Sequence, residues 1–235
     1  MTDPVAGMIV EAGVEQGLQA ELDLLGAVCA GEAEHGLLFW RPDRQALVMP
    51  RRMSRLAGFD EACKVLAESG WPVLLRETGG EPVPQSPATV NIALVYAQPA
   101  TDVDRDRIET AYLRLCQPML KVLAAFGGQS SLGEVEGAFC DGRYNVNLNG
   151  RKLVGTAQRW RQAQGGARPV VLVHGALLLD NQRDEMVAAV NLFYQSCGLA
   201  PRVQASSHIA LREVFSDDRL LEHLAAAYRQ LLAGL

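Results

Sequence analysis

The sequence lacks features that mark several large classes of protein. It has no window of about 18 apolar residues, which disfavours a membrane-spanning helix. Its first residues, MTDPVAG, carry neither the basic nor the apolar region of a secretory signal, so the sequence predicts a cytoplasmic protein with no membrane partner. Positive charge is in short supply. The 22 Lys and Arg against 27 Asp and Glu give a formal charge of -5, the wrong sign for a protein that binds nucleic acid.

Cysteine is scarce and scattered, and nucleotide-binding motifs are missing. The chain has an odd number of cysteines, with no CxxC pair and no histidine at metal-site spacing: Cys29, Cys63, Cys116, Cys140 and Cys197. This pattern predicts no metal site and no disulfide framework. Neither a Walker-type Gly-Lys-Ser/Thr nor a G-x-G-x-x-G between a strand and a helix is present, which disfavours the ordinary nucleotide-binding folds.

The length and periodicity of the 235 residues predict one domain, 1–235, of the α+β class. Apolar residues at helical spacing predict helices over residues 13–30, 59–69, 108–126, 184–195 and 217–232. Short apolar runs predict strands over residues 73–76, 91–97 and 170–179, and antiparallel hairpins over residues 36–49 and 144–158. Helices and strands do not alternate regularly, so the pattern favours an α+β fold over a doubly wound sheet.

The second hairpin places a lysine close to its turn. Asn149-Gly150 is suited to a two-residue type I′ turn because both positions need a positive φ. This turn pairs Asn147 with Lys152 and Asn145 with Val154, which sets Lys152 among polar neighbours. Lys152 is therefore a candidate for a lysine aimed into a cleft. From the residues alone, an ordinary solvated face is the favoured interpretation.

A glycine-rich loop and one cysteine are the other candidates for chemistry. Gly79 and Gly80 follow a predicted strand that ends at Arg76, and their backbone N–H groups could approach an anion or a carbonyl. The prolines that follow make the loop stiff and extended, so a rigid connection explains it equally well. Cys140 lies in a turn-like context and looks the most exposed of the cysteines. It could be a nucleophile if Lys152 stabilised its thiolate, although a free cysteine is usually a small buried apolar residue.

Three segments together resemble the biotin/lipoate A/B protein ligase family, which includes lipoate-protein ligases and octanoyltransferases. They are Arg76-x-Thr78-Gly79-Gly80 with Val90-Asn91, then Asn149-Gly150-Arg151-Lys152-Leu153-Val154-Gly155-Thr156-Ala157-Gln158-Arg159, and His174-Gly175-Ala176-Leu177-Leu178-Leu179. Their order and spacing match over residues 12–200. The resemblance implies a mixed, mainly antiparallel sheet flanked by helices, with an acyl chain held between the Gly-Gly loop and the lysine hairpin.

The resemblance also implies roles for individual residues. Lys152 would contact the acyl carbonyl, where its ammonium would stabilise a developing oxyanion. The remaining positions would bind the acyl substrate as lining or as walls of its pocket: Arg76, Gly79, Gly80, Asn91, Gly155, Gln158, His174 and Gly175.

Phe139-Cys140-Asp141-Gly142-Arg143-Tyr144 resembles the cysteine segment of octanoyl amidotransferases, although Asp141 replaces their proline. The resemblance implies an acyl thioester on Cys140, passed to a lysine of a lipoyl carrier domain, with no ATP required. The carriers would be acyltransferase subunits of 2-oxoacid dehydrogenases and the glycine-cleavage H protein. Two alternatives stay open: an ATP- and Mg-dependent lipoate-protein ligase, many of which carry an accessory C-terminal domain that this chain is too short to include, and a non-catalytic acyl-binding module.

Overall fold

A seven-stranded sheet forms the centre of the computed structural model, which describes residues 9–102, 104–166, 168–200, 202–217 and 219–235. In spatial order its strands are β1 (Ile9–Ala12), β2 (His35–Pro42), β6 (Thr89–Ala97), β10 (Val170–Leu178), β9 (Arg151–Arg161), β8 (Val146–Leu148) and β7 (Ser130–Leu132). Among the described strands of this sheet, β1 and β2 form the one parallel pair, so the predicted mixed, mainly antiparallel sheet is confirmed. The prediction about a secretory signal falls on residues outside the described part.

A three-stranded sheet lies beside the large one. Its order is β4 (Val73–Arg76), β3 (Ala46–Pro50) and β5 (Val83–Gln85). The hairpin predicted over residues 36–49 is therefore wrong: β2 pairs with β1 and β6, whereas β3 pairs with β4 and β5. The chain crosses between sheets after Pro42. The proline-rich segment supplies edge strand β5, where Pro84 is tolerated because an edge strand needs fewer ladder hydrogen bonds.

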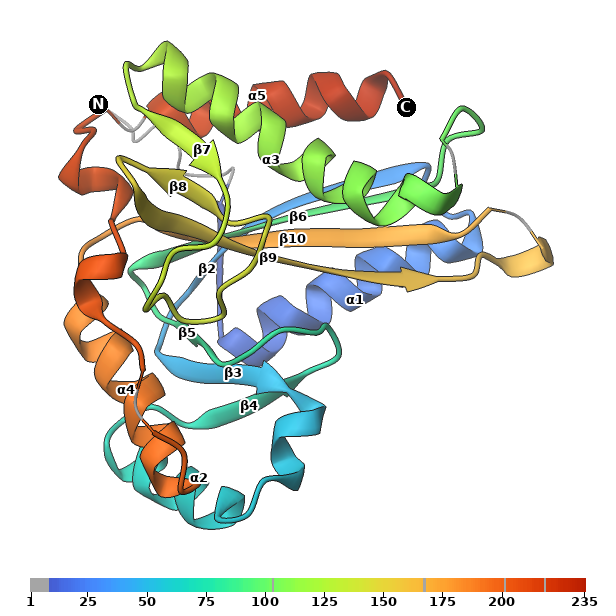
Figure 1. Ribbon diagram of the computed structural model, residues 1–235. Coiled ribbons are helices and arrows are strands. Elements are labelled where there is room, and N and C mark those ends of the chain that lie inside the picture. Colours follow the sequence, from blue (N-terminus) through green and yellow to red (C-terminus); the bar gives the residue numbers. More distant parts are fainter. Residues whose placement is uncertain (1–8, 103, 167, 201, 218) are drawn as a thin grey trace.

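Helices cover both sheets in layers (Figure 1). Helices α3 (Arg107–Ala125) and α5 (Arg219–Ala233) pack on one face of the large sheet, and α1 (Val14–Ala30) packs on the other. Helices α2 (Phe59–Glu68) and α4 (Arg183–Ser196) pack together against the small sheet. Short 3-10 helices connect these elements: η1 (Arg51–Arg55), η2 (Asp104–Asp106), η3 (Gln164–Gly166), η4 (Ala205–Ser207) and η5 (Leu211–Glu213). The α+β class predicted from the sequence is confirmed.

Separate apolar cores hold these layers together. One lies between the large sheet and helices α3 and α5, with Leu94, Leu115 and Tyr228 fully buried in it. Another lies between the small sheet and helices α2 and α4, around Leu66 and Phe193. Within the described parts of the chain, none of the helices combines the length and the apolar character that a membrane crossing requires.

The β8–β9 hairpin forms as predicted at its tip and departs from the prediction below it. Asn149 and Gly150 have φ angles of 51° and 74°, and Asn147 pairs with Lys152. The register then shifts, so that Val146 rather than Asn145 faces Val154. Such a bulge redirects side chains locally. Lys152 is only 2% exposed, so its interpretation as a residue of a solvated face is wrong.

Candidate active site

A cavity lies where the two sheets face each other, next to Cys140. Both sheets, α1 and the loop before β8 contribute to its wall. The lining residues are Leu18, Val48, Arg76, Val83, Gln85, Asn91, Cys140, Gly155, Thr156, Ala157, His174, Gly175 and Ala176. The cavity, called the inner cavity below, therefore brings together segments that are far apart in the sequence.

Cys140 occupies a strained position in the loop between β7 and β8. Its φ is 45°, in the left-handed region that residues other than glycine rarely adopt. It is 9% exposed, so the prediction that it is the most exposed cysteine is wrong; Cys63 and Cys197 are the partly exposed ones. The loop is covered by the Gly79–Gly80 segment, which sequence patterns could not reveal. A strained residue held beside a cavity is typical of a functional site.

The sulfur atom of Cys140 faces a backbone amide and a guanidinium group. The N–H of Glu81 donates to Sγ at 3.2 Å, and Nη2 of Arg76 lies 3.9 Å from Sγ. Arg76 is 8% exposed and also donates to the carbonyls of Gly79 and Glu81, at 2.8 and 3.0 Å. Burial lowers the pKa of Arg76, and the neighbouring charge of Cys140 opposes that shift. These donors are placed to stabilise a thiolate on Cys140.

Lys152 holds the backbone of the cysteine loop. Its Nζ donates to the carbonyl of Phe139 at 2.6 Å and to the carbonyl of Cys140 at 2.7 Å. Burial lowers the pKa of Lys152 to about 8, while the charge of Cys140 acts in the opposite direction. The cysteine loop, between β7 and β8, therefore folds back onto Lys152. The Lys152 ammonium contacts the backbone carbonyl of Cys140 rather than its sulfur. The sulfur is instead contacted by Arg76 and by the N–H of Glu81.

His208, which sequence reasoning missed, supports the same loop from behind. Its Nε2 accepts a hydrogen bond from the N–H of Phe139 at 3.1 Å, and its Nδ1 lies 3.0 Å from the carbonyl of Gln204. The ring stacks on Phe139 with centroids 4.2 Å apart. Burial, and then the charge of Lys152, lower the pKa of His208 to about 4, so the ring is neutral at physiological pH. No motif surrounds His208 in the sequence, so no signal could have identified it.

Polar groups in the wall of the inner cavity are paired with one another. Asn91 and Gln85 exchange amide hydrogen bonds of 2.8 and 3.0 Å. Nδ1 of His174 lies 2.7 Å from Oε2 of Glu21, whose other oxygen accepts a 2.9 Å bond from the indole of Trp40. Glu21 and Gln85 gave no sequence signal, because each reads as an ordinary polar residue of its helix or loop. Their pairing fixes the orientation of the side chains that face the cavity.

Two glycines in the wall of the inner cavity lie where a larger side chain would not fit. A Cβ on Gly175 would lie 2.9 Å from Cγ1 of Val154, closer than real contacts allow. A Cβ on Gly155 would lie 3.2 Å from Cε and Nζ of Lys152. Gly155 and Gly175 therefore let strands β9 and β10 approach the lysine and the cavity, which agrees with their prediction as wall residues.

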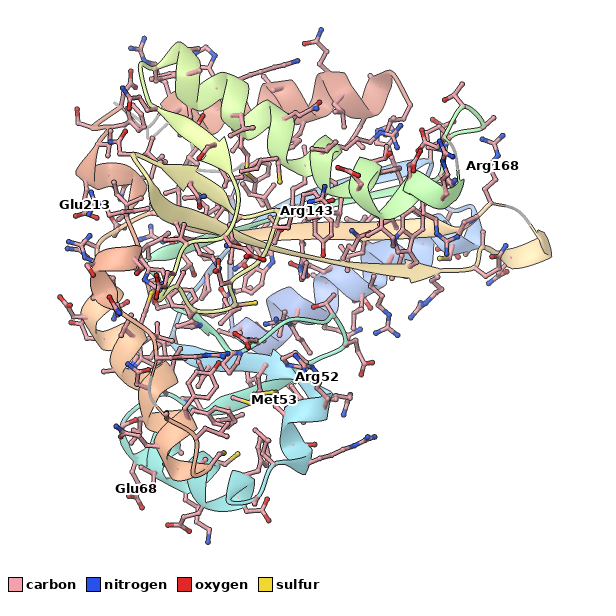
Figure 2. All side chains as sticks on the ribbon, viewed as in Figure 1. Arg52, Met53, Glu68, Arg143, Arg168 and Glu213 are labelled. Atoms are coloured by element: carbon pink, nitrogen blue, oxygen red, sulfur yellow. The ribbon has the colours of Figure 1, made fainter. Side chains whose placement is uncertain are left out.

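A second hollow, called the outer hollow below, reaches Cys140 from another side. Its lining residues are Gly79, Gly80, Tyr112, Cys140, Asp141, Gly142, Arg143, Tyr144, Asn145, Thr156, Ala157 and Gln158. The side chain of Gln158 is already occupied, since it donates to the carbonyl of Ile108 at 2.9 Å and accepts from Trp160 at 2.6 Å. In Figure 2, Arg143 lies beside the large sheet and Arg52 beside the small sheet. Cys140 lines both the inner cavity and the outer hollow.

The residues predicted from the sequence gather around Cys140. The inner cavity, the outer hollow, or the hydrogen bonds described above include every one of them: Cys140, Lys152, Arg76, Gly79, Gly80, Asn91, Gly155, Gln158, His174 and Gly175. Their individual roles stay predictions.

Gly80 and Gly79 give a matched test of the contact above the sulfur. Gly80 has a φ of 103°, and a Cβ there would lie 2.8 Å from Sγ of Cys140 and 2.9 Å from Nη2 of Arg76. We expect Gly80→Ala to displace the donors and to slow alkylation of Cys140 by about tenfold, as for a lost hydrogen bond to a charged group. Gly79→Ala is the control, since its Cβ would meet nothing within 4 Å. Peptide mapping after brief iodoacetamide treatment measures both, and equal rates would contradict the assignment of the sulfur contacts.

Comparison with known proteins identifies the family. The family described as "Lipoyl protein ligase A/B catalytic domain" matches residues 14–222. An uncharacterized protein of Cupriavidus necator is 33% identical over 93% of this chain and 88% of its own length. An octanoyl-GcvH:protein N-octanoyltransferase of Kyrpidia tusciae is 36% identical over 60% of this chain, and the match spans 50% of that enzyme.

Solved structures share the fold. A lipoate-protein ligase A bound with ATP superposes with a TM-score of 0.69 at 15% identity, covering 97% of this chain and 85% of the ligase. A bi-partite lipoate protein ligase from Thermoplasma acidophilum gives a TM-score of 0.63 at 15% identity, covering 96% of this chain and 82% of that one. At these identities the superpositions show the fold alone. With the family match over residues 14–222, the resemblance found in the sequence is confirmed, and the chain belongs to the lipoyl protein ligase A/B catalytic-domain family.

Proposed function

We propose that this chain is an acyltransferase of protein lipoylation, which moves an octanoyl or lipoyl group through a thioester on Cys140 to a lysine of a lipoyl carrier domain. One observation carries the proposal: the Glu81 amide and the Arg76 guanidinium converge on the sulfur of Cys140 between two hollows. A thiol placed in this way has donors for its thiolate and borders two hollows, in which an acyl group and a second reactant could be placed. The names of the relatives agree, since the Kyrpidia enzyme is an octanoyltransferase and a Listeria monocytogenes relative is a lipoyl-GcvH:protein N-lipoyltransferase.

The chemistry takes two balanced steps. The thiolate of Cys140 attacks the acyl carbonyl of the donor, the bond from that carbonyl to the leaving amine breaks, and the amine takes the proton that the thiol gave up. The amine of an acceptor lysine then attacks the thioester, the carbon–sulfur bond breaks, and the amine returns a proton to the sulfur. Both steps build negative charge on the acyl oxygen, which the cations around Cys140 would stabilise. Neither step requires ATP.

The inner cavity has a volume of about 30 Å³, so its walls would have to move apart for it to hold the acyl chain during both steps. Val48, Val83 and Ala176 give its wall an apolar surface that suits an alkyl chain. The carriers would be acyltransferase subunits of 2-oxoacid dehydrogenases and the glycine-cleavage H protein. The printed names of the relatives give GcvH as the protein on which those enzymes act.

The test is transfer without ATP. The protein is incubated with octanoylated H protein, and the intact masses of enzyme and donor are followed before and after an apo lipoyl domain is added. We expect an octanoyl adduct on the enzyme that maps to Cys140, is removed by hydroxylamine and passes to the acceptor. Transfer that begins only with ATP and free lipoate would replace the proposal with a lipoate-protein ligase. Binding of the octanoylated protein without turnover under both conditions would indicate a non-catalytic acyl-binding module.

A further inference from the structure

The two hollows meet at Cys140 and differ in their walls. They share Cys140, Thr156 and Ala157, so a reactant in either one can reach the same sulfur. The inner cavity, of about 30 Å³, is lined by strands of both sheets and by α1, and the outer hollow is the larger of the two, at about 200 Å³. The outer hollow is bounded by α3, by the loop that carries Cys140 and by the Gly79–Gly80 segment, and its rim includes the exposed Asp141 and Arg143. The acyl chain can therefore be assigned to the inner cavity, and the amine joined to its carbonyl to the outer hollow.

A pair of stacked tyrosines forms one wall of the outer hollow. The rings of Tyr112, on α3, and Tyr144, on the cysteine loop, lie with centroids 4.4 Å apart and planes inclined by 11°. Thr156 fixes the backbone below them by donating from Oγ1 to the carbonyl of Tyr144 at 2.9 Å. Asp141 is held as well, because it accepts from the N–H groups of Val135 and Gly142 and from the side chain of Asn145. The wall is thus built before any reactant arrives.

We propose that the outer hollow is the channel for the lysine side chain of the carrier protein, with Tyr112 and Tyr144 as its specificity-determining wall. This inference rests on the proposed function. A lysine side chain is a flexible alkyl stem that ends in an amine. Tyr144 already stacks on Tyr112 and has the guanidinium carbon of Arg143 5.4 Å from its ring centroid, so the wall would stabilise the stem by apolar contact. Because the acyl chain stays in the inner cavity, the donor lysine leaves and the acceptor lysine arrives through this same channel.

A channel shared by the two lysines has a kinetic consequence. The acceptor lysine cannot occupy the channel until the donor lysine has left it. The enzyme should therefore follow ping-pong kinetics, and unacylated carrier should inhibit competitively against acylated donor. On this proposal the enzyme recognises the alkyl stem of the lysine side chain. Ammonia and methylamine, which lack that stem, should therefore react with the thioester more slowly than the side-chain amine of Nα-acetyl-lysine amide.

The experiment separates loading of Cys140 from reaction with the amine. Wild type and variants are loaded with octanoate from octanoylated H protein or a small octanoyl thioester, and loading is followed by intact mass. The loaded enzyme is then mixed with Nα-acetyl-lysine amide, and the rate of thioester loss and octanoyl-lysine formation is measured against amine concentration. We expect Tyr112→Ala and Tyr144→Ala to lower the second-order rate constant with the amine by about tenfold, as for loss of an aromatic contact.

Two further variants keep the result interpretable. Tyr112→Phe retains the ring and should restore most of the reaction with the amine, which a defect in folding would not do. Phe126→Ala removes another aromatic residue at the end of α3, where Phe126 packs against Phe215 with centroids 6.3 Å apart, and should leave both steps unchanged. Loaded tyrosine variants that react with the amine as fast as wild type would overturn the channel and leave the proposed function standing. A wild type that never forms the adduct on Cys140 would overturn both.

Discussion

A Cys140→Ala variant is expected to form no acyl adduct and to transfer no acyl group from donor to acceptor, while it keeps its fold. The thiol is the group on which the Glu81 amide and the Arg76 guanidinium converge, at 3.2 and 3.9 Å. Alanine removes the nucleophile and leaves the Glu81 N–H without its acceptor, whereas Arg76 keeps its hydrogen bonds to the carbonyls of Gly79 and Glu81. Because Cys140 packs among apolar residues of the core beside the small sheet, the lost sulfur should lower the free energy of unfolding by about 1 kcal/mol. Intact mass and thermal unfolding measure the two effects.

Comparison with glycine separates the chemical role of Cys140 from a structural one. At a φ of 45°, a side chain at position 140 costs about 1 kcal/mol that glycine does not. We therefore expect Cys140→Gly to be more stable than Cys140→Ala and equally inactive. A Cys140→Gly variant that is no more stable than Cys140→Ala would mean that the backbone at position 140 is not strained. The strain is consistent with a cysteine that is kept at this position for its chemistry.

Cys116 provides the matched control. It is fully buried in α3, where burial raises the pKa of its thiol to about 12, so it is chemically inert at neutral pH. Cys116→Ala should keep the acyl adduct and the transfer. An adduct that persists in Cys140→Ala and disappears in Cys116→Ala, or in a variant of the partly exposed Cys63 or Cys197, would assign the thioester to another cysteine.

The sequence predicted the elements of the fold better than their partners. Helix α1 ends at Gly31, whose φ is 76°, as the periodicity and the glycine indicated. The type I′ turn at Asn149-Gly150 also follows from local chemistry alone. Strands β2 and β3, in contrast, were predicted to pair with each other because they are close in sequence. Strand β2 pairs with β1 and β6, and strand β3 pairs with β4 and β5. Such pairing depends on the packing of whole layers rather than on the connecting turn.

The candidate site was predicted in its residue types and only partly in its contacts. Cys140, Lys152 and Arg76 were singled out by motif and resemblance, and the structure brings them together. The sequence paired the cysteine with Lys152, whereas its sulfur contacts Arg76 and a backbone amide. A backbone N–H carries no sequence signal, because every residue except proline has one. His208 was missed for a related reason, since a lone histidine in a loop without a pattern resembles any other.

Replacing Lys152 with methionine is expected to slow loading of Cys140 by about 10²-fold, the usual effect of displacing a reactive group by about 1 Å. The ammonium donates to the carbonyls of Phe139 and Cys140 and so fixes the loop that carries the nucleophile. Methionine has a similar length and no donor. At neutral pH the stability should change little, because the two carbonyls lose their partner while the cost of burying a charge disappears. Pre-steady-state mass measurements follow the loading.

The pH dependence gives the sharper test of Lys152, because stability and activity should change in opposite directions. Burial lowers its pKa from 10.5 to about 8, so between these values the unfolded chain binds more protons than the folded one. The stability of wild type relative to Lys152→Met should therefore rise with pH across this window, by up to about 3 kcal/mol. Loading should fall above about pH 8, because the ammonium is lost. Lys64→Met, at an exposed position, should show neither effect. Parallel pH profiles of stability for wild type and Lys152→Met would mean that Lys152 is not the buried cation on which the cysteine loop depends.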